Sequence, residues 1–145
     1  MVWIFQPDRY LLYHQIKLYG NYINGIVLDV GSGPIYRYKH LFTNVETYIT
    51  LDIERDFRPD IVGDATFLPI KNEALDGIVC TQVLEHIKNP FTAVAEFSRV
   101  LKKHGTCLIT VPQTNELHEE PNDFYRFTKY ALYWLASNRK KGGLE

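Results

Sequence analysis

A short apolar run that ends in two glycines is the feature that most constrains this chain. Residues 26–30 (Ile-Val-Leu-Asp-Val) lead directly into Gly31-Ser32-Gly33-Pro34. A continuous apolar run of this length is typical of a strand that is buried on both faces of a parallel sheet. Glycines at its end allow a tight turn and let a ligand approach the backbone. The pattern therefore predicts an α/β sheet with a ligand site after its first strand.

Further strand-like and helix-like segments alternate along the rest of the chain. We predict strands at 47–52, 60–62, 75–80 and 107–111, and helices over 10–22, 34–42, 90–101 and 129–135. Asn89 and Thr128 are expected helix caps, Lys102 and Lys103 suit the end of the third helix, and Gly105 suits a left-handed stop. The alternation predicts a Rossmann-like, doubly wound, mostly parallel sheet of about five strands in the order 3-2-1-4-5.

Composition excludes several classes of protein. The 145 residues suit one domain, and a net charge of −1 without a basic, aromatic-rich motif argues against nucleic-acid binding. No apolar run approaches the ~18 residues of a membrane span, and no basic leader precedes the apolar start. The two cysteines, Cys80 and Cys107, are expected as buried small side chains. Two cysteines fit a reduced compartment, so we expect a cytoplasmic protein.

Polar side chains follow the ends of several predicted strands. Asp52 ends the second strand roughly 20 residues after Gly31, the spacing at which a carboxylate binds ribose hydroxyls. Asp64 and Ala65 follow the third strand, and Gln82 follows the fourth. Taken singly, each has an ordinary alternative: a bare glycine turn, a capped strand end or a turn aspartate. Because the carboxyl ends of parallel strands meet at one edge of a sheet, their joint occurrence predicts a single site.

Five segments together resemble the successive motifs of class I S-adenosylmethionine-dependent methyltransferases, in the type 11, small-molecule branch. They are residues 29–33 (Asp-Val-Gly-Ser-Gly), 51–53 (Leu-Asp-Ile), 63–69 (Gly-Asp-Ala-Thr-Phe-Leu-Pro), 75–79 (Leu-Asp-Gly-Ile-Val) and 83–87 (Val-Leu-Glu-His-Ile). The resemblance covers roughly residues 24–135. It implies one domain with three parts: an N-terminal helical segment at 1–23, a cofactor-binding core at 24–111, and a substrate loop with the last helix at 112–145.

The resemblance also implies a cofactor and its contacts. The cofactor would be S-adenosylmethionine, with S-adenosylhomocysteine as the product. Its methionine end would lie beside Asp29, Gly31, Ser32 and Gly33, its ribose beside Asp52 and Ile53, its adenine beside Asp64 and Ala65, and its sulfonium near Gln82. This cofactor has no phosphate, so the third glycine of the dinucleotide pattern, whose slot holds Tyr36, is not needed.

The segment after the fifth strand, residues 112–127, is where the resemblance places the acceptor site. His118 is the candidate base for a hydroxyl acceptor, and Tyr125 and Arg126 are candidates for binding a sugar or an anionic substrate. The alternative is that His118, Asp123 and Arg126 form a hydrogen-bonded anchor for the loop. No histidine pair has a convincing metal-ligand spacing, so we expect no metal.

The chain ends one helix after the fifth strand, whereas the family continues with two more strands. The fifth strand would then be a sheet edge, and we expect the last helix, the N-terminal helix or a second copy in a homodimer to cover it. The predicted function is methyl transfer to a small molecule, with a sugar or sugar-linked metabolite as one acceptor class. A cofactor-binding but non-catalytic fragment or partner subunit is the main alternative. An NAD-dependent oxidoreductase is disfavoured by Tyr36 and by the Asp64-Ala65 pair.

Overall fold

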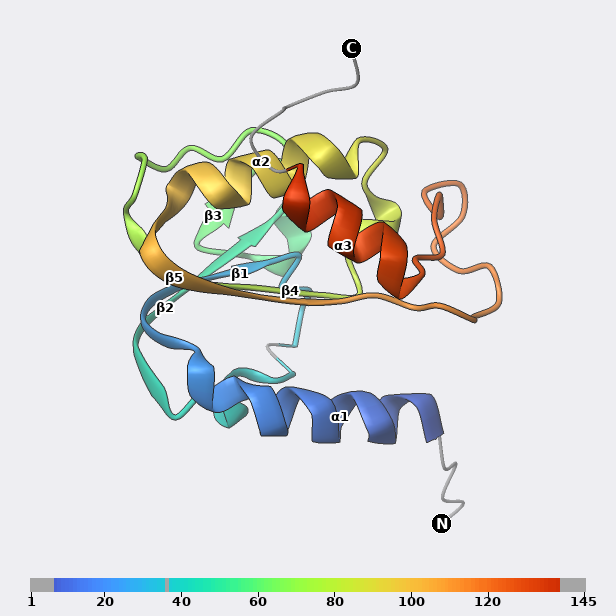
Figure 1. Ribbon diagram of the computed structural model, residues 1–145, viewed down its shortest axis with the longest axis horizontal. Coiled ribbons are helices and arrows are strands. Elements are labelled where there is room, and N and C mark those ends of the chain that lie inside the picture. Colours follow the sequence, from blue (N-terminus) through green and yellow to red (C-terminus); the bar gives the residue numbers. More distant parts are fainter. Residues whose placement is uncertain (1–6, 36, 139–145) are drawn as a thin grey trace.

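Five parallel strands form the centre of the fold in a computed structural model that describes residues 7–35 and 37–138 (Figure 1). The strands are β1 (Asn24–Val30), β2 (Asn44–Asp52), β3 (Ile61–Val62), β4 (Leu75–Thr81) and β5 (Leu101–Thr110). Their order in the sheet is β3-β2-β1-β4-β5, and every pairing is parallel. The predicted α/β class and strand order are confirmed.

Helices cover both faces of this sheet. Helix α1 (Pro7–Tyr19) lies on one face, and α2 (Pro90–Val100) and α3 (Lys129–Ser137) lie on the other (Figure 1). Two apolar clusters fill the spaces between the layers, one around Leu28 and Phe97, the other around Ile16 and Val27. The central strands are therefore buried on both sides, as their uninterrupted apolar runs predict. Among the described residues, no helix is both long and apolar enough to cross a membrane.

The two expected helix caps are present. The Asn89 side chain accepts a hydrogen bond from the backbone N–H of Thr92, and Pro90 occupies the first helical position of α2. The Thr128 side chain does the same for the N–H of Ala131 at the start of α3. These caps set where the helices begin, and thereby orient the segments before them toward the strand ends.

The helix expected over 34–42 does not form among the described residues, which exclude Tyr36. Only a single 3-10 turn, Lys39–Leu41, is present there. Leu41 and its neighbour Phe42 are both buried in the cluster under α1, while Ile35 is 68% exposed. Since β-branched and aromatic residues have weak helix propensity, this packing decides the backbone, and the segment runs along the mouth of the cleft described below.

The predicted end of α2 is also wrong. The helix stops at Val100 and β5 begins at the next residue, so Lys102 and Lys103 lie in the strand. The Lys102 Nζ donates to Asp76 Oδ1 at 2.9 Å, a partner on β4 that the sequence did not reveal. The left-handed residue is His104, with φ 70°, and not Gly105. At Gly105 a Cβ would lie 2.9 Å from the Leu101 side chain, which explains the glycine by close packing.

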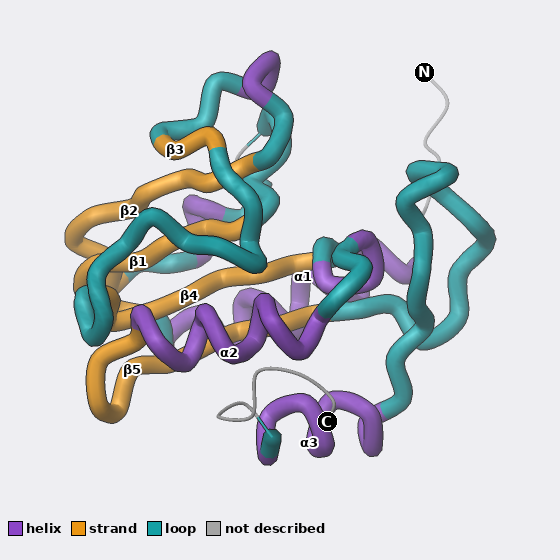
Figure 2. The backbone as a smooth tube through the Cα atoms, turned by 90° about the horizontal axis from the view of Figure 1, so that it is seen from above, coloured by secondary structure: helices purple, strands orange, loops and turns teal. Residues whose placement is uncertain are grey.

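The outer edge of β5 is not paired with another strand of the described chain (Figure 2). Cys107 on this strand is exposed, contrary to the expectation that both cysteines are buried, whereas Cys80 on β4 is buried. The register pairs Cys80 with Ile109 and Cys107 with Ile78, so the two thiols are not direct partners. An edge strand has neighbours on one side only, which leaves its side chains less covered.

Candidate functional site

One open cleft of about 1860 Å³ lies at the carboxyl ends of the strands. Every residue that the sequence suggested for cofactor contact lines it: Asp29, Gly31, Ser32, Gly33, Asp52, Ile53, Asp64, Ala65 and Gln82. The volume exceeds the ~300–1,000 Å³ of a usual small-molecule pocket, so the cleft has room for two ligands side by side.

The turn after β1 has a backbone that requires its glycines. Gly31 and Gly33 have φ values of +68° and +64°, in the left-handed region that favours glycine. At Gly31 a Cβ would lie 2.4 Å from the Val83 side chain, whereas at Gly33 it would meet nothing within 4 Å. Gly31 thus permits close packing against the segment after β4, and Gly33 leaves its backbone open to a ligand.

Asp52, at the end of β2, links the glycine turn to the next strand end. It is 6% exposed, and its two carboxylate oxygens accept from the N–H groups of Gly33 and Glu54, each at 2.9 Å. A carboxylate oxygen has room for a second hydrogen bond. The side chain is therefore held in place by the backbone and can still accept from two adjacent hydroxyl groups.

Asp29, on β1, is also buried and lines the same cleft. The Tyr48 hydroxyl donates to Asp29 Oδ2 at 2.7 Å. Burial raises the pKa of Asp29 to about 6, which the hydrogen bond from Tyr48 opposes and the charge of Asp52 reinforces. Burial and the neighbouring Asp29 likewise raise the pKa of Tyr48, which stays a donor. A carboxylate held in so unfavourable a place gains most from a ligand cation beside it.

The segment after β3 contributes Asp64, Ala65 and Thr66 to the lining of the cleft. Asp64 Oδ1 accepts from the backbone N–H and the hydroxyl of Thr66, at 2.7 and 2.8 Å. Its Oδ2 has no hydrogen bond within the described part of the chain. Ala65 is buried, while Ile53, which also lines the cleft, is 66% exposed. The second oxygen of Asp64 is available to accept a hydrogen bond from an amino group of a ligand.

Two strained or unpartnered groups complete this wall. Gln82 has a left-handed backbone, φ 56°, held by its N–H donating to the Thr110 carbonyl at 2.8 Å. Such strain in a residue other than glycine is concentrated at functional sites. The hydroxyl of Ser32 is buried and finds no hydrogen-bond partner among the described residues. A buried hydroxyl without a partner costs free energy that a polar ligand atom would recover.

The loop over 112–127 has an internal anchor. The Arg126 guanidinium donates to both oxygens of Asp123, at 2.6 and 2.8 Å, and to three backbone carbonyls. Arg126 therefore holds the pKa of Asp123 well below its usual range. The Tyr125 hydroxyl donates to the Lys88 carbonyl at 2.8 Å. Neither Tyr125 nor Arg126 lines the cleft, but His118 does. The geometry is that of the loop anchor that the sequence left open.

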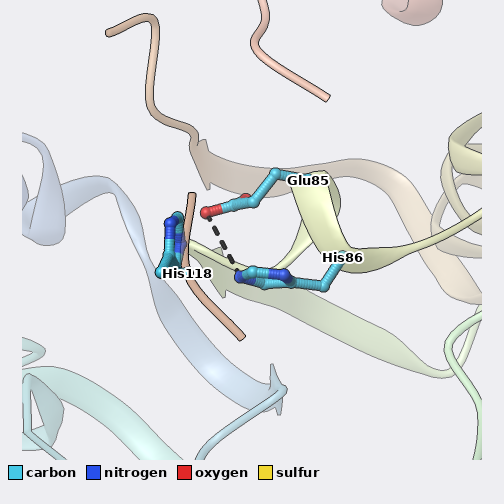
Figure 3. Close-up of side chains that lie close together, drawn as sticks. All are labelled: Glu85, His86 and His118. Carbon is cyan, nitrogen blue, oxygen red and sulfur yellow. Dashed lines mark ion pairs between the residues drawn. The ribbon is translucent and has the colours of Figure 1, made fainter. Parts of the chain in front are cut away.

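A cluster of three side chains at the cleft wall was missed by sequence reasoning (Figure 3). Glu85 and His86 follow β4, and His118 comes from the loop; one ligand atom of each lies within 4.8 Å of the others. The Glu85 carboxylate is fully buried, and neither of its oxygens has a hydrogen bond. Burial raises the pKa of Glu85, an effect opposed first by the N–H of its own backbone and then by the nearby His86, His118 and Arg126. The adjacent Glu-His pair at a strand end was the available signal.

Comparison with known proteins identifies the family to which this chain is similar. The family described as a methyltransferase domain matches residues 28–109. The protein MJ0638 of Methanocaldococcus jannaschii is 31% identical over 121 residues, which cover 79% of this chain and 53% of that protein. MJ1252 of the same organism is 30% identical over 82% of this chain and 43% of its own length. The chain thus spans about half the length of these curated relatives.

Solved structures share the fold. The YcgJ protein from Bacillus subtilis superposes with a TM-score of 0.72 at 18% identity, covering 90% of this chain and 68% of that chain. A SAM-dependent methyltransferase from Archaeoglobus fulgidus superposes with a TM-score of 0.69 at 19% identity, also covering 90% of this chain and 68% of its own. At these identities the likeness establishes the architecture of the sheet and helices.

Proposed function

Because this chain belongs to the methyltransferase domain family, we propose that it transfers a methyl group from S-adenosylmethionine to a small-molecule acceptor. The observation that carries the proposal is the convergence of the strand-end residues on one cleft. Acidic side chains from β1, β2 and the segment after β3 line it together with the glycine turn. Such a set suits an adenosine that carries cationic groups better than it suits a string of phosphates.

The described geometry supports a role for each cofactor-side residue. Asp52 would accept from the two ribose hydroxyls, and Asp64 from the adenine amino group, with Ile53 and Ala65 against the ring. Asp29 would face the ammonium end, and Ser32 would give its orphaned hydroxyl to the methionine part. The turn at Gly31 and Gly33 would lie against the same part, and Gln82 would form the wall near the sulfonium.

S-adenosylmethionine, when bound, would supply an activated methyl group on a positively charged sulfur. The chain's own task is then alignment, because a direct displacement at carbon gains mostly from proximity and from the exclusion of water. The backbone hydrogen bonds to Asp52 and the strained backbone of Gln82 hold the two ends of this wall rigid. With the cofactor side held rigid, the alignment of the reaction would depend on how the acceptor is positioned against the methyl group.

The acceptor we propose is a hydroxyl-bearing small molecule such as a sugar or a sugar-linked metabolite. The part of the cleft formed by the loop is mixed. Polar side chains line it at Gln113, Thr114, Asn115, Glu116, His118, Glu119 and Asn122, and apolar ones at Pro112, Leu117 and Phe124. Amide and hydroxyl groups of this kind bind hydroxyls by hydrogen bonds. His118 is the residue we place next to the reacting hydroxyl, and Tyr125 and Arg126 act on the acceptor through the shape of the loop.

Calorimetric titration tests the cofactor half of this proposal. The full chain is titrated with S-adenosylmethionine, S-adenosylhomocysteine and NAD, because Arg9 and Arg37 also line the cleft and a diphosphate must be excluded. We expect both methionine-derived ligands to bind and NAD not to. Asp52→Ala, and Asp52→Asn as the milder change, should each weaken binding by about 1–3 kcal/mol through lost charged hydrogen bonds. Asp56→Ala, an exposed aspartate outside the cleft, is the matched control.

Turnover separates an enzyme from a binding protein. The chain spans about half of its curated relatives, which is why binding without catalysis is the second candidate. Incubation with S-adenosylmethionine labelled at the methyl group and a panel of sugars and sugar nucleotides should yield a labelled acceptor. Tight binding of S-adenosylhomocysteine with no labelled product in any acceptor class would favour the non-catalytic reading. NAD binding in preference to the other ligands would refute both.

A further inference from the structure

The buried Glu85 carboxylate is the one acidic group in the described chain that is fully buried without any hydrogen bond. A buried carboxylate is normally paired or bound to a metal, because leaving it alone costs several kcal/mol. The nearest basic group, His86 Nε2, is 3.9 Å from Glu85 Oε1, which is too long for a hydrogen bond. The Glu85 carboxylate therefore has no hydrogen-bond partner among the described residues.

Both histidines in the cluster hold their Nδ1 atoms against backbone carbonyls. His86 Nδ1 is 2.7 Å from the Asn122 carbonyl oxygen, and His118 Nδ1 is 3.0 Å from that of Glu116. A carbonyl can only accept, so the proton of each neutral ring is on Nδ1. The lone pair of each imidazole is then on Nε2. This is the tautomer that metal-binding histidines adopt when a carbonyl or carboxylate orients them from behind.

Asp123 adds a carboxylate behind His118. Its Oδ2 lies 3.5 Å from His118 Nδ1, and it also accepts from the backbone N–H of His118 at 2.9 Å. Asp123 is in turn fixed by the two-pronged contact of Arg126. A carboxylate behind a histidine raises the basicity of the opposite nitrogen and fixes the ring. The loop anchor thus orients His118 toward Glu85 and His86.

We propose that Glu85, His86 and His118 bind a divalent transition-metal ion of the Zn²⁺ type. Two imidazoles and one carboxylate are the donor set of open zinc sites, which keep a fourth position for water or substrate. The ligand atoms lie within 4.8 Å of one another, compared with about 3.3 Å for atoms placed tetrahedrally at ~2.0–2.1 Å from zinc. To bring the ligand atoms to these shorter distances, the loop that carries His118 would move, since Glu85 and His86 both come from the segment that follows β4.

The fourth coordination position faces the cleft. His86 and His118 both line it, while Glu85 closes the site from the interior. An ion there would take an oxygen of the acceptor and favour its deprotonated form, since a bound Zn²⁺ lowers the pKa of such a ligand. This assignment to the acceptor rests on the proposed function; the binding of the ion itself does not.

Zinc titration of the full chain tests the site. The protein is freed of metal with a chelator, and Zn²⁺ and Mg²⁺ are titrated separately at neutral pH by calorimetry. We expect one Zn²⁺ per chain and no comparable Mg²⁺ binding, since imidazole is a poor ligand for Mg²⁺. Glu85→Gln and His118→Ala should each weaken Zn²⁺ binding by more than about tenfold. His40→Ala, an exposed histidine outside the cleft, should bind Zn²⁺ as the unaltered chain does.

Outcomes separate this site from the proposed function. Thermal unfolding without metal shows whether each variant folds, and His118→Ala alters only a partly exposed side chain on a loop. Zn²⁺ binding without S-adenosylhomocysteine binding would support the site and contradict the proposed function. S-adenosylhomocysteine binding with no Zn²⁺ bound would overturn the site alone. Zn²⁺ binding that both Glu85→Gln and His118→Ala leave intact would also overturn it.

Discussion

Asp29 and Asp52 lie on neighbouring strands and are both buried, but their carboxylates have different partners. Asp52 accepts from two backbone N–H groups, whereas Asp29 has one hydrogen bond, from the Tyr48 hydroxyl. Burial raises the pKa of Asp29 to about 6, close to working pH. Asp29 is therefore a carboxylate of the cleft wall whose charge responds to a ligand or to mild acid.

Lowering the pH from 7 to 5 should weaken the binding of S-adenosylmethionine, with a midpoint near pH 6. Asp29 takes up its proton in this range and loses the charge that would attract the ligand's ammonium group. The ammonium itself stays charged, because an α-amino group has a pKa of about 7.7–8.0. Dissociation constants measured by calorimetry across this range give the profile. Asp29→Asn should bind the ligand more weakly at pH 7 and lose the pH dependence. Asp56→Asn should bind it as the unaltered chain does, with the same pH dependence.

Through the same residue, lowering the pH should stabilise the ligand-free protein even though it weakens ligand binding. A raised pKa means that folded Asp29 holds a proton at pH values where the unfolded chain has released it. Its contribution to stability is fully present below about pH 3.8 and is lost as the pH rises through about 6. A melting temperature that falls together with affinity between pH 7 and 5 would show that another group governs the effect.

The convergence of the strand-end residues on one cleft could be predicted because each lies at or just after the end of a strand. In a parallel sheet the strand ends meet, so Gly31, Asp52 and Asp64 need only the correct strand assignment to come together. The cluster of Glu85, His86 and His118 could not be predicted in this way. It depends on the course of the loop over 112–127, which Arg126 and Asp123 determine through contacts without any periodic signal.

Helix α2 acts on the cleft through a side-chain clamp on its outer face. Arg99 donates to the carbonyls of Leu68 and Ile70 at 3.0 and 2.8 Å, and pairs with Glu96. Glu96 in turn accepts from the N–H of Leu68 at 2.8 Å. The clamped segment directly follows the one that carries Asp64 and Ala65. Helix α2 therefore holds the proposed adenine slot from behind.

Replacement of Arg99 by alanine should destabilise the fold and loosen this slot. A hydrogen bond to a charged group contributes a net ~1.5–3 kcal/mol to stability. Solvent screening lowers that contribution in a partly exposed site, so we expect a total loss of about 2–3 kcal/mol. Urea unfolding measures that loss. S-adenosylhomocysteine affinity should fall severalfold although Arg99 does not line the cleft. Arg55→Ala, an exposed arginine, is the control; equal effects of both changes would contradict the clamp.

Local sequence signals were sufficient to predict where the helices α2 and α3 begin. Asn89 with Pro90, and Thr128, marked the starts of α2 and α3 because capping depends only on neighbouring residues. The segment over 34–42 and the junction at Leu101 were decided by packing instead. Leu101 pairs with Leu75 directly after the helix, and Gly77 pairs with Thr106. The residues in between, which were expected to end the helix, lie in the register shift between these two pairs. Because these boundaries depend on contacts between residues far apart in the sequence, the local pattern of apolar residues could not predict them.

For the whole molecule, the open question is what pairs with β5. Helix α1 lies on one side of the sheet and α3 on the other (Figure 1), and α3 runs beside β5 (Figure 2). In the described residues, β4 is the strand that pairs with β5. Of the three coverings expected from sequence, the two helices leave the edge hydrogen bonds unmatched. A row of unpaired N–H and C=O groups is a template for another strand. A second copy of the chain, the third of these expected coverings, could supply such a strand.

The chain should accordingly self-associate through β5, and a charge on this edge should oppose it. Cys107 is exposed on the strand, so Cys107→Lys adds charge without entering the core. Like charges brought together across the new strand pair should cost about 1 kcal/mol, which corresponds to a dimer roughly fivefold weaker. Light scattering coupled to size exclusion over a range of concentrations gives the dimer fraction. Leu18→Lys, at a 65% exposed position on α1, adds the same charge elsewhere and should not change it. A chain that stays monomeric at the highest concentration would mean that its fifth strand is stable with a solvated edge.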